Sequence, residues 1–370
     1  MNIVHITSHL NIGGITSYLL GLSGALTARG HAVVVASGGG RLAPRLDALG
    51  VTHWRVPLAT SAEFGPPVWL ATHQLARRLQ AHPVDLIHAH TRVGQVAAAI
   101  LSRRLGVPYL TTWHGFFRRN LGRRLWPCTG ALTIAISEPV RQHLLAVFRL
   151  PPERIRLIHH GIDVEDFSNG DEPSERARAR QAQGIPDGVP VIGGIGRLAA
   201  WRVKGFDVLL SAAAQVRRQV PDVQVVLLGD GPAPPALQRQ IESLDLTSCV
   251  RILPGAPDTR AALALMDVFV FPIRGTEGFG LSLIEAMAAG KPVVAARTGA
   301  VPEILEHGRS GWLVDPEHMA SLAEGITRLL RDAALAAQLG RQARERARER
   351  FSLSRMIDQV EAVYREVLAA

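Results

Sequence analysis

The chain has 370 residues, of which 47% are hydrophobic and 20% charged, and its formal net charge is +9. This composition is that of a globular protein of about two or three domains and excludes a disordered chain. No apolar run approaches the roughly 18 residues of a membrane span, and the first residues lack a basic region, so neither a transmembrane helix nor a signal peptide is predicted.

The two cysteines, Cys128 and Cys249, are too few for a disulfide scaffold and are not spaced as a metal site. We expect reduced, buried thiols and therefore a cytoplasmic protein. The positive charge suits an anionic partner, such as a phosphate-bearing substrate, a lipid surface or nucleic acid. Dispersed arginines that only maintain solubility would give the same net charge.

The first half of the chain alternates short apolar runs with helical patterns. Helices are predicted near Ile15–Arg29, Val68–Gln80 and Val93–Leu105. This alternation predicts a parallel sheet with right-handed crossovers. The predicted strands are Ile3–Thr7, Ala32–Ala36, Asp85–Ala89, Pro108–Thr112 and Ala131–Ile136.

A polar, turn-rich stretch from Ser168 to Pro173 interrupts this pattern and is typical of a linker. We therefore predict one Rossmann-like domain at 1–165, a linker region at 166–188 and a second Rossmann-like domain at 189–350. The last segment, 351–370, is predicted to be a helix that packs back toward the first domain.

The second half repeats the β/α alternation. Its predicted strands are Val189–Ile195, Val223–Leu228, Val250–Leu253, Val268–Phe271 and Pro292–Ala295. Its predicted helices are Phe206–Val220, Pro234–Ser243, Thr259–Leu265, Leu281–Ala289 and Leu322–Arg331, and the last ~30 residues carry only helical patterns. Together the halves predict an α/β protein with two doubly wound sheets and a central cleft between them.

The most informative segment places two carboxylates eight positions apart, Glu277 and Glu285, on either side of a Gly-x-Gly turn and a helix start. A helix N-terminus offers free N–H groups and a positive dipole, so a diphosphate can bind there. The carboxylates can accept hydrogen bonds from hydroxyls on both sides of it. Apolar neighbours favour burial of Glu285 over an exposed position, and a buried carboxylate needs a partner. A nucleotide sugar has the required groups.

Two further glycine-rich turns follow predicted strands. After Gly194-Ile195-Gly196, Arg197 and Lys204 are suited to a diphosphate. The turn lacks a third glycine and an acidic residue about 20 positions later, which weakens a dehydrogenase interpretation. The turn around Asp230 either brings backbone close to a ligand or is only a turn.

The first half offers Gly13 and Gly14 before a helix, where glycines can cradle phosphate. His114, after a strand, is suited to donate a hydrogen bond to a sugar hydroxyl, although a histidine at a strand end is often structural. His88 and His90 alternate along a strand, but spacing suggests no third ligand, so no metal site is predicted.

In combination, these motifs resemble those of glycosyltransferase family 4, whose members are retaining enzymes of the GT-B fold. The resemblance covers essentially the whole chain and rests on Gly13-Gly14, Gly196-Arg197, Lys204-Gly205 and Glu277-x7-Glu285 with the following Ala-Met-Ala-Ala-Gly-Lys-Pro-Val-Val. It implies a hexosyltransferase that moves a sugar from a nucleotide diphosphate sugar to an acceptor hydroxyl, with no cofactor and no obligatory metal. Cell-surface polysaccharide, lipopolysaccharide or glycolipid synthesis is the implied setting.

The resemblance also implies residue roles, with the acceptor side in the first domain and the donor nucleotide in the second. Glu285 would bind the ribose, and Glu277 and His114 would be the catalytic positions beside the donor sugar. Gly278 and Phe279 would contact that sugar, and the donor phosphates would be bound by Arg197, Lys204, Gly13, Gly14, Gly280 and Leu281.

The chain departs from the family pattern in two places. His160 stands where the family often has Asn before Gly-Ile-Asp, and Trp201-Arg202-Val203 separates the two phosphate-binding cations. The sequence contains no Asp-x-Asp, which agrees with a metal-independent enzyme.

The segment Phe116–Trp126 interleaves aromatic residues and leucines with Arg118, Arg119, Arg123 and Arg124. This composition suits peripheral contact with the anionic inner face of the cytoplasmic membrane and a lipid-linked or glycan acceptor; a helix with solvated arginines is the alternative. Two other functions remain open: a nucleotide-sugar 2-epimerase and a non-enzymatic basic binding protein. No nucleic-acid-binding motif is found.

Overall fold

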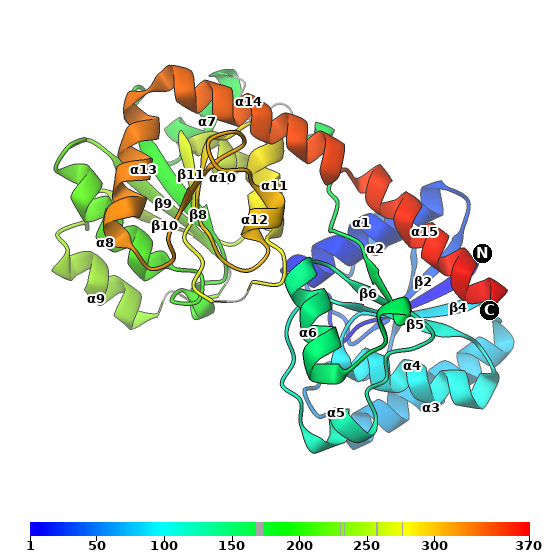
Figure 1. Ribbon diagram of the computed structural model, residues 1–370. Helices are drawn as coiled ribbons and strands as arrows, with labels where there is room; N and C mark the ends of the chain where they lie inside the picture. Colours follow the sequence, from blue (N-terminus) through cyan, green and yellow to red (C-terminus); the bar gives the residue numbers. More distant parts are fainter. Residues whose placement is uncertain (168–172, 230, 233, 257, 276) are drawn as a thin grey trace. The chain divides into compact units, whose positions relative to one another are not determined.

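The computed structural model describes residues 1–167, 173–229, 231–232, 234–256, 258–275 and 277–370. It divides into two compact units, one formed by Met1–Gly161 with Leu353–Ala370 and the other by Ile162–Ser352 (Figure 1). Most of the polar stretch expected to be a linker, 168–172, and Asp230 of the second glycine-rich turn lie outside the described residues.

The first unit contains a seven-stranded sheet in which all neighbouring strands are parallel, in the order β3-β2-β1-β4-β5-β6-β7. Because β1 lies between β2 and β4, the winding direction reverses beside it, where such sheets bind ligands. The strands are β1 (Asn2–Ile6), β2 (Ala32–Ser37), β3 (Thr52–Arg55), β4 (Leu86–Ala89), β5 (Tyr109–Trp113), β6 (Thr133–Ala135) and β7 (Ile155–Leu157).

Helices cover both faces of this sheet. Successive residues of β1 alternate between two apolar clusters, with Ile3 packed with α1 and α15 on one face and Val4 packed with α3 and α4 on the other. The helices of the unit are α1 (Gly14–Ala28), α2 (Arg45–Ala48), α3 (Pro66–Ala81), α4 (Arg92–Leu105), α5 (Leu121–Leu125), α6 (Glu138–Phe148), the 3-10 turn η1 (Pro152–Arg154) and α15 (Leu353–Ala369).

The second unit has a six-stranded parallel sheet in the order β10-β9-β8-β11-β12-β13. The winding reverses between β8 and β11. The strands are β8 (Val191–Ile195), β9 (Gln224–Gly229), β10 (Val250–Pro254), β11 (Val268–Phe271), β12 (Val293–Ala296) and β13 (Trp312–Val314).

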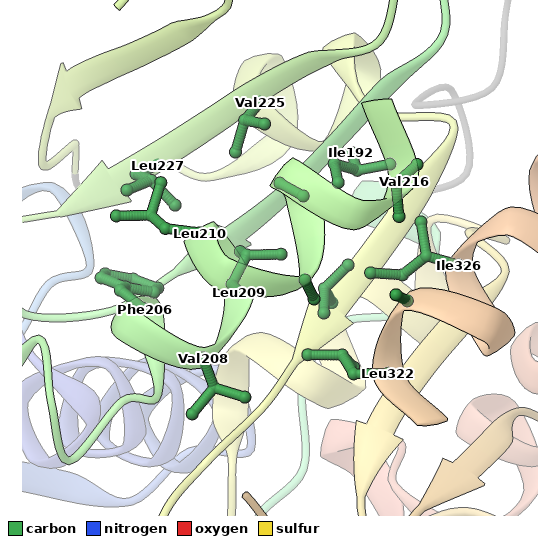
Figure 2. Close-up of a cluster of buried hydrophobic side chains, with 14 of the residues drawn as sticks. Ile192, Phe206, Val208, Leu209, Leu210, Val216, Val225, Leu227, Leu322 and Ile326 are labelled. Atoms are coloured by element: carbon green, nitrogen blue, oxygen red, sulfur yellow. The ribbon is translucent and has the colours of Figure 1, made fainter. Parts of the chain in front are cut away.

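Apolar side chains of this sheet are buried under α8 and α13. Figure 2 shows Leu209 of α8 and Leu322 and Ile326 of α13 among side chains from β8 and β9, all of them buried. The helical segments are α7 (Pro173–Ala182), η3 (Leu198–Ala200), α8 (Phe206–Arg217), α9 (Pro235–Ser243), α10 (Arg260–Leu265), α11 (Leu281–Ala288), α12 (Val301–Ile304), α13 (Met319–Arg331) and α14 (Ala333–Arg350).

The predicted fold class, two Rossmann-like α/β domains with C-terminal helices, is confirmed. Three strands were not predicted: β3, β7 and β13. Each has three or four residues and lies at the edge of its sheet, where a strand pairs on one side only and the buried apolar run that marks a central strand is not needed.

Candidate active site

The loops after β8 and β11 carry most of the predicted donor-site residues. These strands are neighbours, and the strand order reverses between them. The carboxyl ends of parallel strands at such a point form the usual ligand site of a doubly wound sheet.

The loop after β8 holds two cations. Arg197 is exposed at the N-cap position of η3, and its side chain makes no hydrogen bond or ion pair with any described residue. Lys204 lies over Gly196, where an added Cβ would stand 2.9 Å from the lysine Cγ. Next to it, Gly205 has φ +71°, and a Cβ there would stand 1.8 Å from the carbonyl oxygen of Pro272. Glycine is therefore required for the loops after β8 and β11 to pack together.

The loop after β11 brings Glu277 to the same place. The Lys204 ammonium donates a hydrogen bond of 2.8 Å to the Glu277 carboxylate, and these side chains are 16% and 24% exposed. The sequence predicted both residues for the donor site, but with separate ligands. In this structure they bind each other, so each charge is compensated while remaining accessible.

Helix α11 begins directly after this loop. Gly280, with φ +120°, precedes it, and Phe279 is buried edge-on against Phe351. Among the described residues, no acceptor bonds the amide N–H groups of Leu281 and Ser282 at the first turn. These amides and the helix dipole favour an anion at this end.

Glu285 lies about one turn into α11. Its carboxylate accepts a 2.9 Å hydrogen bond from the Thr259 hydroxyl. Burial raises the pKa of Glu285 to about 7, Thr259 opposes this shift, and the charge of Asp258 adds to it. Sequence analysis missed Thr259, which stands at the N-cap of α10 without making a capping bond. A threonine at this position ordinarily indicates only a helix start.

In the first unit, Gly13 follows β1 with φ +154° and precedes α1, which has no side-chain cap. A Cβ added at Gly13 would meet nothing within 4 Å. The space beside Gly13 at the start of α1 is therefore open, and phosphate binding at Gly13 and Gly14 stays a prediction.

His114 follows β5 and has both ring nitrogens within reach of other imidazoles. Its Nε2 lies 3.4 Å from His90 and its Nδ1 lies 3.2 Å from His160. Tyr18 contacts the ring edge-on, and burial lowers the pKa of His114 to about 3. His114 is therefore neutral at physiological pH.

The first sheet also brings His5 beside His88, because β1 and β4 pair in parallel with these residues in register. Ring nitrogens of His5, His88 and His90 lie within 4.8 Å of one another. Spacing along the chain could not indicate this third imidazole. His88 is already engaged, since Tyr364 and Thr112 hydroxyls each lie 2.7 Å from one of its nitrogens.

The basic segment after His114 forms the short helix α5. Leu121 and Leu125, one turn apart, are 70% and 75% exposed, and Arg118, Arg119 and Arg124 are exposed beside them. The fourth arginine of this segment, Arg123, instead forms an ion pair with Glu63 and lies over the Phe117 ring. Three of the four predicted arginines thus face solvent.

Exposed aromatic residues extend this surface. Phe64 packs against Gly122 of α5 and stacks on Trp126, and the Trp69 indole donates a hydrogen bond to the Phe64 carbonyl. Phe64 is 41% exposed and Trp69 is 52% exposed. Phe64, Trp69, Leu121, Leu125, Arg118, Arg119 and Arg124 are called the α5 patch below.

Two family models together match most of the chain. The model described as Glycosyltransferase Family 4 matches residues 12–166, and that described as Glycosyl transferases group 1 matches residues 189–332. These ranges include β2 to β7 of the first sheet and all strands of the second.

Individual relatives agree with these models. The chain is 31% identical to the D-inositol 3-phosphate glycosyltransferase of Pseudarthrobacter chlorophenolicus, over 74% of this chain and 69% of that protein. It is 29% identical to the GDP-mannose-dependent alpha-(1-6)-phosphatidylinositol monomannoside mannosyltransferase of Mycolicibacterium smegmatis, over 89% and 88%. A solved structure of Anabaena HepE with UDP and glucose is similar at 26% identity and TM-score 0.85, covering 98% of both chains.

Proposed function

Since the chain belongs to glycosyltransferase family 4 and is a nucleotide-sugar-dependent hexosyltransferase of the GT-B fold, we propose that it retains the anomeric configuration, needs no metal and acts on a lipid-linked or glycan acceptor at a membrane surface. The Lys204–Glu277 pair at the carboxyl ends of β8 and β11 is the observation that carries the donor part of this proposal. It supplies a cation for phosphate and a carboxylate for sugar hydroxyls side by side.

Departure of a nucleoside diphosphate leaves negative charge on its phosphate oxygens. Arg197, Lys204 and the first amides of α11 are the groups that stabilise this charge in the proposed reaction. Arg197 has no partner among the described residues, so it can bind a phosphate without losing an existing interaction. These groups perform the electrostatic task that a divalent cation performs in metal-dependent enzymes.

The remaining donor groups follow from the same positions. Glu285 binds the ribose hydroxyls, which replace or join Thr259 as donors to its buried carboxylate. Glu277 contacts the donor sugar together with Gly278 and Phe279. We assign Gly13, Gly14 and His114 to the first unit's side of the same reaction, and the departing phosphate takes the proton of the acceptor hydroxyl.

A donor screen tests the proposed reaction. Purified protein is incubated with UDP-, GDP- and ADP-sugars, with and without lipid extracts as acceptors, in buffer containing EDTA. Release of the nucleoside diphosphate together with a glycosylated product of retained configuration supports the proposal. Epimerisation of the donor, activity only after divalent cations are added, or no reaction and no thermal shift with any donor would each contradict it.

The α5 patch supports membrane contact. Exposed leucines and aromatic side chains can enter the headgroup region, and each arginine near an anionic surface contributes about 1 kcal/mol. Within the described residues, no helix combines the length and apolarity needed to span a bilayer. We propose that this patch places the enzyme at the cytoplasmic face of the membrane, beside its acceptor.

Liposome co-sedimentation tests this contact. We expect binding to vesicles with anionic lipid, weaker binding at high salt, and loss of binding in the Arg118→Ser, Arg119→Ser double variant and in Leu121→Ser. Arg103→Ser with Arg104→Ser is the matched control, because this pair is also exposed but lies at the end of α4. Equal recovery with neutral vesicles, or equal losses in both double variants, would overturn the proposal.

A further inference from the structure

Five histidines of the first unit gather on one face of its sheet. Ile3 and Leu86 belong to the apolar cluster under α1 and α15, and His5 and His88 stand two residues beyond them on the same face. His90, His114 and His160 continue this face at the carboxyl ends of the strands. The rings of His5, His88 and His90 are fully buried.

Four of these rings form a chain through their nitrogens. Nδ1 of His5 lies 3.0 Å from Nε2 of His90, and Nδ1 of His90 lies 3.4 Å from Nε2 of His114. Nδ1 of His114 in turn lies 3.2 Å from Nε2 of His160. Every link joins Nδ1 of one ring to Nε2 of the next, so the chain runs in one sense. His88 stands outside it, bonded to hydroxyls.

The protons of this chain must all point the same way. A neutral imidazole has one N–H and one lone pair, so a ring that donates through one nitrogen accepts through the other. Nε2 of His5 is buried without a hydrogen-bond partner. Protons pointing toward His5 would place a buried N–H on this atom, whereas protons pointing toward His160 would place one on Nδ1 of His160, so the two ends do not select a direction. The links require only that the rings share one tautomer, with the N–H on the same ring position in each.

We propose that His5, His90 and His160 are positioning residues that hold His114 as a neutral ring in the one tautomer that the four linked rings share. The proposal rests on the proposed function only where it assigns His114 to the reaction. With both nitrogens engaged, this ring neither removes a proton from an acceptor hydroxyl nor donates one to it without breaking a link. The ring of His114 then stays fixed and neutral. This agrees with the proposal that the departing phosphate takes the proton of the acceptor hydroxyl.

The surroundings of the chain keep it neutral. Burial lowers the pKa of His5 and of His114 to about 3 and holds that of His90 well below its usual range. The titratable groups that face the cluster are Tyr18 of α1, Tyr364 of α15 with Glu361 behind it, and His159 beside His160. Among the described residues, no carboxylate is hydrogen-bonded to His5, His90 or His114.

Nitrogen NMR tests the chain without any assay of transfer. In 15N-histidine protein, long-range proton–nitrogen spectra distinguish protonated from bare ring nitrogens. We expect His5, His90 and His114 to be protonated at the same ring position, with the other ring nitrogen bare, from pH 8 to pH 6, with exposed His73 as the reference for a solvated ring. Different tautomers among these three rings, or titration of His114 within this range, would overturn the proposal.

A pair of variants tests the positioning role. His90→Gln keeps one donor and one acceptor, whereas His90→Leu has neither. We expect His90→Leu to lower kcat about tenfold to a hundredfold with little change in donor KM, because His114 is displaced, and His90→Gln to recover most of the loss. Thr112→Val, which removes a hydrogen bond to His88 but no link of the chain, is the control for damage to the cluster. Equal losses in the two His90 variants would show that the links have no positioning role.

Metal binding is the competing outcome. A transition metal held by His5, His88 and His90 would replace the proton between His5 and His90. We expect no stoichiometric binding when Zn²⁺ alone is titrated into the protein, followed by calorimetry and the same spectra. One equivalent bound, with loss of the His5 and His90 signals, would replace the hydrogen-bonded chain by a metal site. Failure of transfer in the donor screen, with the NMR result intact, would count against the proposed function and not against the chain.

Discussion

The ammonium group of Lys204 lies 2.8 Å from the carboxylate of Glu277, and the pair joins the loops that follow two neighbouring strands of the second sheet. Both side chains are mostly buried, so removing either one leaves the other partly desolvated and without a partner. In the proposed reaction, the donor phosphate would bind Lys204 and the sugar hydroxyls would bind Glu277 in place of this ion pair.

Loss of either partner is expected to reduce transfer strongly. Lys204→Ala and Glu277→Gln should each lower kcat/KM by about 10²-fold or more, because each removes charge complementarity at the reacting group. Since the residues contact each other, the double variant should lose less than the sum of the two free-energy losses. Steady-state kinetics of all four proteins measures this, with circular dichroism to check folding. Additive losses would show that the residues act independently.

Arg197 and Arg202 form a matched pair in the same loop. The exposed side chain of Arg197 has no partner among the described residues, whereas that of Arg202, also exposed, stacks on Trp201. We expect Arg197→Ala to weaken binding of the free nucleoside diphosphate by roughly tenfold, since a charge-assisted hydrogen bond is worth about 1.5–3 kcal/mol, and Arg202→Ala to leave it unchanged. Calorimetric titration compares them. Equal affinities of the two variants would remove Arg197 from the phosphate site.

Sequence patterns predicted individual donor-site residues but not the residues that they contact. Lys204, Glu277 and Glu285 belong to segments whose local pattern already indicates a strand end or helix start. The Thr259–Glu285 bond, between residues 26 positions apart, depends on how the loops beside α10 and α11 fold, which no short pattern encodes. The same holds for His5, which becomes a neighbour of His88 only through the parallel register of β1 with β4.

Glu285 makes the stability of the second unit dependent on pH. Its pKa is raised from 4.5 to about 7 in the folded protein, so its contribution is fully present below pH 4.5 and is lost as the pH rises through 7. The loss reaches on the order of 3 kcal/mol at pH 8. Glu285→Gln cannot ionise but still accepts the Thr259 hydrogen bond. Its melting temperature relative to wild type should therefore rise between pH 5 and pH 8.

Thr259→Val is the control for this effect. It removes the hydrogen bond that favours the ionised carboxylate. This variant should therefore lose more stability than the wild type as the pH rises from 5 to 8. A difference between Glu285→Gln and wild type that does not change with pH would mean that Glu285 is already ionised at pH 5.

The histidine cluster makes the stability of the first unit fall as the pH is lowered, which is opposite to the effect of Glu285 on the second unit. The pKa of His5 and of His114 is lowered from 6.5 to about 3 by burial, so the unfolded chain binds protons that the folded unit excludes. Stability is complete above pH 6.5 and falls at lower pH by about 1.4 kcal/mol per pH unit for each histidine. Amide hydrogen exchange of β1 and β4 at several pH values, corrected for intrinsic rates, measures it. His5→Phe should reduce the slope, whereas exposed His73→Phe should not.

Gly205 allows the Lys204 loop to reach the loop after β11. In Gly205→Ala the new Cβ would stand 1.8 Å from the carbonyl oxygen of Pro272 at φ +71°, so the backbone must move. Gly184→Ala, at φ +60° with nothing within 4 Å, has the same conformational strain without the collision. We expect Gly184→Ala to cost about 1 kcal/mol with normal transfer. Gly205→Ala should be less stable and should also lose most transfer, because Lys204 moves away from Glu277. Equal melting temperatures and activities for the two variants would show that the contact between these loops does not position Lys204.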